Sequence, residues 1–245
     1  MEEEAGVSSW AKKALRLAFP SYCAGCGEVP SGSGVAHLCV DCVRKVHLIE
    51  DPRCETCGYP FFGESENRML CPHCEGLSPV FDRGFAIALF KGGVRGLVYA
   101  LKYEGGLWTL DDIRALAGRS PGLLDFMGDS VLVPVPLHSR KLRERGYNQS
   151  ELLAREFEKL SRELVVDDLL ERVVDTPSQT QFNRQERRRN LKNAFSLRQN
   201  RAIDPAKRYI IVDDVFTTGS TINACAAALL SAGASRVDAL TFGHG

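Results

Sequence analysis

The sequence lacks a long apolar segment and a secretion signal. No apolar run in its 245 residues approaches the roughly 20 residues that cross a bilayer as a helix. The first residues, Met1–Glu4, are acidic, whereas a signal peptide begins with a basic region followed by an apolar one. These two features argue against a transmembrane segment and predict a cytoplasmic location.

The chain also lacks an excess of charge of either sign. Lys and Arg together number 31, and Asp and Glu also number 31. A net charge of zero excludes the global basicity that would indicate a nucleic-acid-binding protein. The apolar fraction of 44% and the charged fraction of 25% are ordinary for a globular protein. The length suffices for one domain and a small additional module.

Cysteine is absent from residues 75–224 but dense before them. The ninth cysteine, Cys225, falls on the apolar face of a predicted helix and is expected in the core. The other eight form four Cys-x-x-Cys pairs, separated by 12, 11 and 13 residues. These pairs are Cys23/Cys26, Cys39/Cys42, Cys54/Cys57 and Cys71/Cys74.

Paired cysteines at this spacing predict two structural Zn²⁺ sites, because tetrahedral zinc takes four ligands and each pair supplies two. Cys26 and Cys57 are each followed by glycine, as in a zinc knuckle. Sequential pairing joins the first pair to the second and the third to the fourth, and a cross-brace pairing is compatible with the same spacing. Disulfides conflict with a cytosolic chain, and an iron–sulfur cluster is a weaker alternative. The histidines among these cysteines are interpreted as surface residues: His37, His47 and His73.

The most informative stretch, Arg208–Thr221, runs from an apolar segment into two acids and then into a loop of small residues. Tyr209–Val212 has the pattern of a buried strand, with Asp213 and Asp214 at its end. A helix is predicted after the loop, with Gly233 as its stop. The apolar residues with helical spacing are Ile222, Cys225, Ala226, Leu229 and Leu230.

A loop that opens a helix holds phosphate, because its backbone N–H groups are free and the helix dipole is positive there. Gly219 allows close approach of the backbone, and neighbouring hydroxyls add donors. The two carboxylates can accept hydrogen bonds from a sugar on that phosphate. The pattern therefore predicts a ligand with a 5′-phosphate and vicinal hydroxyls; the alternative is an ordinary turn with solvated acids. The loop residues are Thr217, Thr218, Gly219, Ser220 and Thr221.

A second basic segment follows a strand predicted for Ser130–Pro136, whose prolines make the strand end irregular. Asn148 is the predicted N-cap of the next helix, with Glu151 at its third position. Such a segment is either an anion site or a solvated basic loop. Lys102, before a glycine pair, suits a helix dipole and an anion contact equally well. The cations of the segment are His138, Arg140, Lys141, Arg143 and Arg145.

Composition divides the chain into three parts. Residues 1–20 read as a helical lead-in, and the cysteine module spans 21–78. An α/β domain is expected over 79–245, with strands at Phe85–Phe90 and Val237–Phe242. Within it, residues 108–118 are predicted to be helical, 119–129 to form a loop and 165–174 to hold a short strand.

Val212–Thr221 resembles the phosphoribosyl-pyrophosphate (PRPP) signature of type I phosphoribosyltransferases. The whole arrangement resembles the ComF family of competence proteins, which combine a double zinc ribbon with such a domain. The resemblance implies an α/β fold, a mainly parallel sheet flanked by helices, with an N-terminal double zinc ribbon. Besides the signature and the cysteine pairs, the matching pieces are Leu101–Tyr103, Val133–Pro136, Arg145–Gln149, Thr180–Gln181 and Arg184–Asn190.

The resemblance also implies roles for individual residues. Thr217–Thr221 would cradle the 5′-phosphate, and Asp213 and Asp214, the catalytic pair, would hold the ribose hydroxyls. Mg²⁺ would bridge pyrophosphate and ribose, and the reaction would displace pyrophosphate from ribose C1. The cations implied for the pyrophosphate are Lys102, Arg140, Arg143, Arg145 and Arg184.

Two functions of different class follow from the resemblance. In the first, the chain is a phosphoribosyltransferase acting on PRPP, with an acceptor that the sequence does not identify. In the second, it is a non-catalytic PRPP sensor or scaffold. The candidate partners are PRPP, single-stranded DNA, a competence helicase or other DNA-uptake proteins, and the inner membrane face through peripheral contact.

Overall fold

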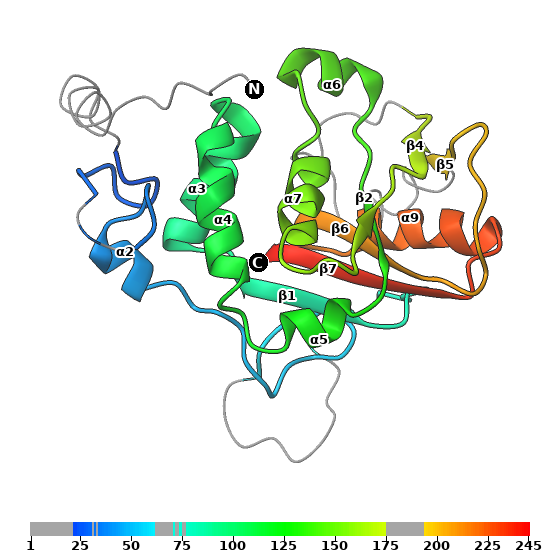
Figure 1. Ribbon diagram of the computed structural model, residues 1–245, viewed down its shortest axis with the longest axis horizontal. Coiled ribbons are helices and arrows are strands. Elements are labelled where there is room, and N and C mark those ends of the chain that lie inside the picture. The colour runs from blue at the N-terminus through cyan, green and yellow to red at the C-terminus, as the bar shows by residue number, and fades with distance from the viewer. Residues whose placement is uncertain are drawn as a thin grey trace, which may run out of the picture.

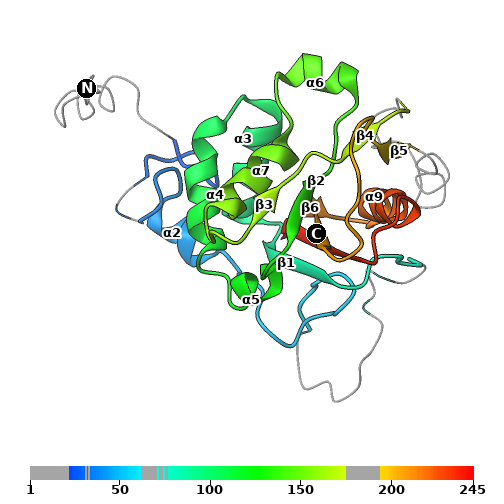
Figure 2. The same ribbon diagram turned by 45° about the vertical axis from the view of Figure 1, so that its right-hand side comes forward.

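The computed structural model describes residues 22–30, 32, 34–61, 71, 74, 77–174 and 194–245. The predicted lead-in helix, His73, Arg184 and the rest of the Thr180–Asn190 segment lie outside these residues. The described chain forms an α/β fold around one five-stranded sheet, with helices on both faces (Figures 1 and 2).

All neighbouring strands in this sheet run parallel, in the order β1-β7-β6-β2-β3. The strands are β1 (Gly84–Leu89), β2 (Val131–Pro134), β3 (Val165–Val166), β6 (Arg208–Phe216) and β7 (Arg236–His244). A separate antiparallel pair consists of β4 (Leu170–Arg172) and β5 (Phe195–Leu197). The predicted parallel sheet flanked by helices is therefore confirmed.

Helices lie between β1 and β2, between β2 and β3 and between β6 and β7, as crossovers between parallel strands require. The helices are α2 (Val40–Arg44), α3 (Gly92–Tyr103), the 3₁₀ turn η1 (Leu107–Thr109), α4 (Leu110–Ala117), α5 (Leu123–Met127), α6 (Ser139–Arg145), α7 (Gln149–Glu158) and α9 (Ser220–Ser231). Among the described residues, every helix is too short or too polar to cross a lipid bilayer.

Alternate residues of each central strand pack into different hydrophobic clusters, because successive side chains of a strand point to opposite faces. In β6, Ile210 and Val212 face the cluster that contains α3, α4 and α7. Tyr209 and Ile211 face the cluster that contains α9. Both faces of the sheet are therefore buried, as the near-continuous apolar pattern of Tyr209–Val212 predicts.

The cysteine module contributes to both of these clusters. Cys23, Val35 and Leu38 belong to the cluster on the α3 side. The four cysteines from Cys54 to Cys74 belong to the cluster on the α9 side. Ile49 lies between the first four cysteines and the last four cysteines of the module. Its N–H donates to the carbonyl oxygen of Ile87, 2.9 Å away, along the open edge of β1. The module thus packs on the sheet domain at two separate places.

Three local expectations change in the structure. Strand β6 continues to Phe216, so Asp213 and Asp214 lie within the strand, and Asp213 pairs with Thr241 of β7. The segment 119–129, predicted as a loop, contains the short helix α5, whose Leu123 and Met127 are buried. The stretch 165–174 holds two strands in different sheets, β3 and β4. In each case tertiary contacts outweigh the local pattern.

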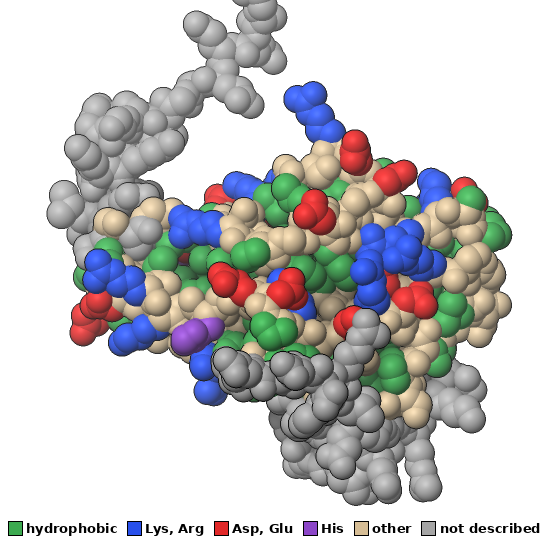
Figure 3. All heavy atoms as spheres, turned by 90° about the horizontal axis from the view of Figure 1, so that it is seen from below, with side chains coloured by type: hydrophobic (Ala, Val, Ile, Leu, Met, Phe, Trp, Pro, Cys, Tyr) green, Lys and Arg blue, Asp and Glu red, His purple; other side chains and the backbone are tan. Residues whose placement is uncertain are grey.

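The surface has mixed charge. On the face seen in Figure 3, basic and acidic side chains are interspersed among apolar and neutral ones. This distribution agrees with the net charge of zero.

Candidate functional site

The two adjacent acids have different surroundings. Asp214 is 3% exposed, and both of its carboxylate oxygens have protein partners. Lys102 Nζ lies 2.7 Å from Oδ1, and Gln149 Nε2 donates to Oδ2 at 3.0 Å. Asp213 accepts a hydrogen bond from the Ser150 hydroxyl at 3.0 Å on Oδ1. The pair is therefore held by α3 and by the first turn of α7.

The start of α7 is fixed by the predicted cap. Asn148 accepts a hydrogen bond from the Ser150 N–H at 3.1 Å and donates to the carbonyl oxygen of Val135 at 3.0 Å. This cap ties the first turn of α7 to the chain after β2. Gln149 and Ser150, which bind the acids, occupy that same turn, so the cap positions them.

The pKa values of this cluster reflect burial and close charges. Burial and the neighbouring Asp214 carboxylate raise the pKa of Asp213 to about 7, against the opposing effect of Lys102. Burial alone would lower the pKa of Lys102, but the charges of Asp214 and Asp213 raise it instead. Lys102 therefore stays protonated at neutral pH, whereas Asp213 titrates near neutral pH, at about 7.

The predicted phosphate loop lies between β6 and α9. Gly219 is the N-cap of α9 with φ +68°, a left-handed conformation that glycine adopts readily. The hydroxyls of Thr218 and Ser220 lie 3.0 Å apart. Ser220 and Thr221 lie in the first turn of α9, a helix of twelve residues. The backbone N–H groups of this turn, which have no partner within the helix, therefore lie at the loop.

The acids and the phosphate loop line one cleft of about 230 Å³. Lys102 and Gln149 line it from α3 and α7, and Val135–Leu137 from the chain after β2. Sequence reasoning gave no site role to Gln149, which ends the matching segment Arg145–Gln149, or to Lys141, and it did not name Arg172. Arg172 lies on β4, the strand that only the fold brings to this edge.

The predicted basic residues of α6 lie at different places. Arg140 and Arg143 are exposed and do not line the cleft. Arg145 hydrogen-bonds Gln149 Oε1, and its guanidinium carbon lies 5.8 Å from the ring centre of Tyr103. Arg145 is thus connected to the acids through Gln149, which itself contacts Asp214.

Two further cavities lie on the α3 side. One of about 380 Å³ shares Lys102, Val215 and Thr217 with the walls of the cleft. A larger one of about 980 Å³ lies between α3 and the first group of cysteines. Its aromatic lining residues are Tyr22, Tyr99 and Trp108, together with His37.

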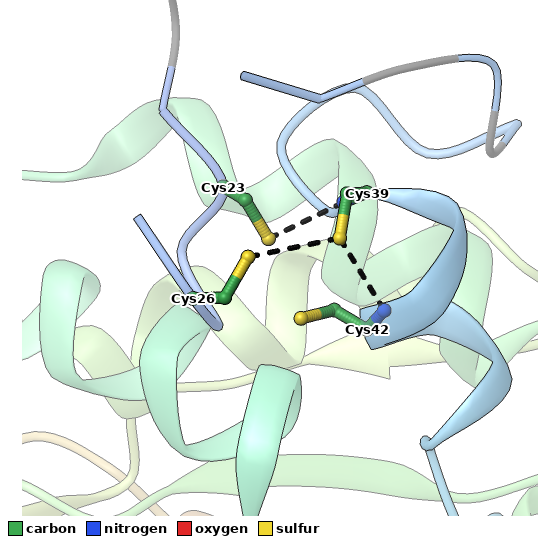
Figure 4. A group of neighbouring side chains, drawn as sticks. All are labelled: Cys23, Cys26, Cys39 and Cys42. Atoms are coloured by element: carbon green, nitrogen blue, oxygen red, sulfur yellow. Dashed lines mark hydrogen bonds between the residues drawn. The ribbon is translucent and has the colours of Figure 1, made fainter. Parts of the chain in front are cut away.

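The first group of cysteines brings four sulfur atoms together, as Figure 4 shows. Cys23 and Cys26 come from a tight turn, and Cys39 and Cys42 from the start of α2. The sulfurs of Cys26 and Cys39 are 3.7 Å apart. Zn–S bonds of about 2.3 Å in a tetrahedron place sulfurs about 3.8 Å apart, so the spacing fits zinc.

The second group is fully buried and has the same spacing. Cys54 Sγ lies 3.8 Å from Cys74 Sγ, and Cys57 Sγ lies 3.7 Å from Cys71 Sγ. All nine cysteines are free thiols. The pairing is therefore sequential, first pair with second and third with fourth, and not the cross-brace.

The chemistry of the donor set also fits a cation. Hydrogen bonds with the thiols of Cys57 and Cys74 lower the pKa of Cys54, and the reciprocal contacts with Cys54 and Cys74 raise the pKa of Cys57. Four such close thiols cannot all ionise without a compensating charge. A divalent ion supplies that charge, so the two four-cysteine groups are structural zinc sites by geometry and by charge.

Comparison with known proteins gives consistent results. Residues 14–75 match the model of the double zinc ribbon domain. The chain is 30% identical over 228 residues to the DNA utilization protein YhgH of Escherichia coli K12, covering 90% of this chain and 96% of that protein. It is 29% identical over 199 residues to competence protein F of Haemophilus influenzae, covering 76% and 87%. It is 23% identical over 202 residues to competence protein ComFC of Bacillus subtilis, covering 80% and 79%.

Proposed function

The chain belongs to the family of competence protein F and the DNA utilization protein YhgH, the ComF family, and we propose that it binds PRPP together with Mg²⁺. The observation that carries this proposal is the single cleft that contains two acids, a helix-opening loop and three cations. The loop, Thr217–Thr221, suits a 5′-phosphate. Asp213 and Asp214 suit the ribose hydroxyls, and Lys102, Lys141 and Arg172 suit the pyrophosphate.

Protein contacts already use part of the acceptor capacity of the two acids. Lys102 and Gln149 each contact one oxygen of Asp214, and Ser150 donates to Oδ1 of Asp213. Mg²⁺ commonly keeps waters and binds through one or two carboxylates and substrate phosphates, which agrees with this donor set. When bound, the ion would neutralise the pyrophosphate and favour its departure.

The reaction that such a site supports is transfer of the 5-phosphoribosyl group. The bond from ribose C1 to the pyrophosphate oxygen breaks, and a bond from C1 to a nucleophilic acceptor forms. Positive charge develops on the sugar and negative charge on the leaving group. The aspartates and the three cations would stabilise these charges, and no covalent intermediate with the protein is required.

The names of the relatives, "competence" and "DNA utilization", support a role in DNA uptake or use. We place this role in the cytoplasm, with single-stranded DNA, a competence helicase or other DNA-uptake proteins as partners and peripheral contact with the inner membrane face. Zinc ribbons and exposed basic residues such as Arg140 and Arg143 suit such contacts.

One observation favours the second function, a DNA-binding scaffold. The exposed Tyr and Trp side chains of the described residues are Tyr22, Tyr99, Tyr103 and Trp108, with 62%, 53%, 66% and 42% exposure. All four line the two cavities on the α3 side. Exposed aromatic rings beside cations provide stacking surfaces for unpaired bases. This surface would serve a scaffold whether or not transfer occurs.

Calorimetric titration of PRPP and Mg²⁺ into the zinc-loaded protein, with and without single-stranded DNA, tests both functions. We expect saturable PRPP binding that is lost when Asp213→Asn and Asp214→Asn are combined. Asp125→Asn, an exposed acid of α5, is the matched control. DNA binding should survive the double substitution. Salt-sensitive DNA binding without any PRPP binding would replace the first function by the second.

A further inference from the structure

The second zinc site and the phosphate loop are neighbours, although the sequence separates them widely. The four cysteines of this site, Cys54, Cys57, Cys71 and Cys74, share a hydrophobic cluster with Phe216 and Ile222. Phe216 directly precedes the phosphate loop, and Ile222 lies in the first turn of α9. Two separate chains of contacts connect the metal site to these residues.

The first chain of contacts leaves the site after Cys74. Leu77 donates its N–H to the carbonyl oxygen of Cys74 at 2.8 Å. A Cβ placed on Gly219 would lie 3.0 Å from Leu77 Cδ2, so Leu77 packs directly on the loop glycine. The hydrogen bond to Cys74 therefore helps to hold the Leu77 side chain against the residue that opens α9.

The same segment is also fastened to α9 by hydrogen bonds. Asn223 accepts from the N–H of Val80 at 2.7 Å and donates to the carbonyl oxygen of Ser78 at 3.1 Å. Its own N–H donates to the carbonyl oxygen of Gly219 at 2.8 Å. One side chain thus joins the exit of the zinc site to the first turn of the helix that opens at the phosphate loop.

The second chain of contacts leaves the site after Cys57. Tyr59 lies edge-on to His244, with ring centres 5.0 Å apart, and His244 stacks on Phe216, also at 5.0 Å. Gly245 donates its N–H to the carbonyl oxygen of Phe216 at 3.1 Å. The ring of Phe216 in turn packs against Gly219. Both arms of the zinc site therefore end at the same glycine.

The first zinc site has a different set of neighbours. Leu38 beside Cys39 packs on Gly93 of α3. The N–H groups of Ala36 and His37 donate to the Asp112 carboxylate at 2.8 and 2.7 Å, which fixes the loop to α4. The residues around the first zinc site therefore contact α3 and α4, whereas those around the second contact the phosphate loop.

We propose that the second zinc site positions the phosphate loop, with Leu77, Asn223 and the Tyr59–His244–Phe216 stack as the positioning residues. This inference rests on the proposed function, because the loop is the proposed 5′-phosphate site. Zinc at the second site stabilises the loop conformation that binds phosphate. By thermodynamic reciprocity, a phosphate ligand must then stabilise zinc at that site by the same factor.

The test uses the full zinc-loaded chain and ribose 5-phosphate as the probe, because this probe lacks the pyrophosphate. Leu77→Ala and Asn223→Ala leave all eight cysteines intact. We expect each to weaken ribose 5-phosphate binding about fivefold or more, with two zinc ions retained per chain. The matched controls are Leu124→Ala on α5 and Ser231→Ala at the end of α9, both exposed. These controls should bind as the wild type does.

A second measurement follows zinc release to a colorimetric chelator, with and without ribose 5-phosphate. Release should have two phases, because Cys26 in the first site is exposed whereas all cysteines of the second site are buried. The probe should slow the slower phase alone, and Leu77→Ala should reduce this protection. Suppose that the wild type binds ribose 5-phosphate, that both variants bind it with the same affinity, and that the probe does not change zinc release. This result would overturn the coupling but not the proposed function. Failure of the wild type to bind either ribose 5-phosphate or PRPP overturns the proposed function as well.

Discussion

Lys102 Nζ lies 2.7 Å from Asp214 Oδ1 and so connects the last turn of α3 to strand β6 at the edge of the cleft. Asp214 is almost fully buried, and a buried carboxylate without a cationic partner is strongly destabilising. The contact is therefore a structural link, and it fixes Lys102, one of the three cations of the proposed PRPP site, at the cleft.

Replacing Lys102 with Gln should lower the free energy of unfolding by roughly 3 kcal/mol, because the substitution leaves the Asp214 charge buried and unpaired. Urea denaturation measures the change, and PRPP binding should be lost at the same time. Adding Asp214→Asn should recover part of the stability but none of the binding. Lys91→Gln, an exposed lysine before α3, is the control. Equal stability of wild type and Lys102→Gln would contradict this account of the contact.

The pH dependence of stability should carry a contribution from Asp213. Its pKa in the folded protein is about 7, above the ordinary value of about 3.9. The unfolded chain releases this proton first, so the stability contributed by Asp213 is fully present below about pH 4 and is lost as the pH rises towards 7. Asp213→Asn removes the titration, and the difference in unfolding free energy between wild type and variant should change over this window. A difference that is constant with pH would argue against the raised pKa.

PRPP binding should depend on pH in the opposite sense. An ionised carboxylate accepts hydrogen bonds from ribose hydroxyls more strongly than a protonated one. Affinity should therefore rise between about pH 6 and about pH 8 as Asp213, with its pKa of about 7, loses its proton. Titration calorimetry at several pH values, in buffers of different ionisation enthalpy, also counts the protons released on binding. Binding without proton release over this range would show that ionisation of Asp213 does not contribute to PRPP binding.

Zinc content should follow the sequential pairing of the cysteines. The wild type should hold two zinc ions, and Cys26→Ser and Cys71→Ser should each remove one, as native mass spectrometry would show. Cys71→Ser should cost more stability, because Cys71 is 0% exposed and Cys26 is exposed. Cys225→Ala should retain both ions, because Cys225 is a core residue of α9 and belongs to neither four-cysteine group. Loss of both ions in Cys26→Ser would mean that the sites do not load independently.

Gly96→Ala should separate the first zinc site from α3. A Cβ at Gly96 would overlap the carbonyl group of Ala24, which is backbone and cannot rotate away. We expect a loss of roughly 2 kcal/mol in unfolding free energy and faster zinc release from the first site. Gly118→Ala is the control, since its added methyl group would meet its neighbours at ordinary contact distances of 3.5 Å and more. Unchanged zinc release in Gly96→Ala would show that docking on α3 does not support the site.

Some features of this protein follow from local sequence alone. The Cys-x-x-Cys spacing predicts tetrahedral zinc, because two residues between ligands form a turn around one ion. The apolar run Tyr209–Val212 predicts a strand buried on both faces, and β6 is such a strand. Asn148 is the N-cap that its position before an apolar helix indicates. All of these can be recognised from patterns of residues that lie close together in the chain.

Tertiary structure decided what the local pattern could not. The spacing of the four cysteine pairs allows two pairings, and only packing on opposite faces of the sheet selects the sequential one. Lys102 suits a helix dipole as well as an anion, and only the contact with β6 gives it a carboxylate partner. Arg172 carries no motif and Gln149 only ends the matching segment Arg145–Gln149, and the fold brings both to the cleft. The link from Cys74 through Leu77 to Gly219 joins distant segments, and such contacts depend on how layers stack, which local periodicity does not encode.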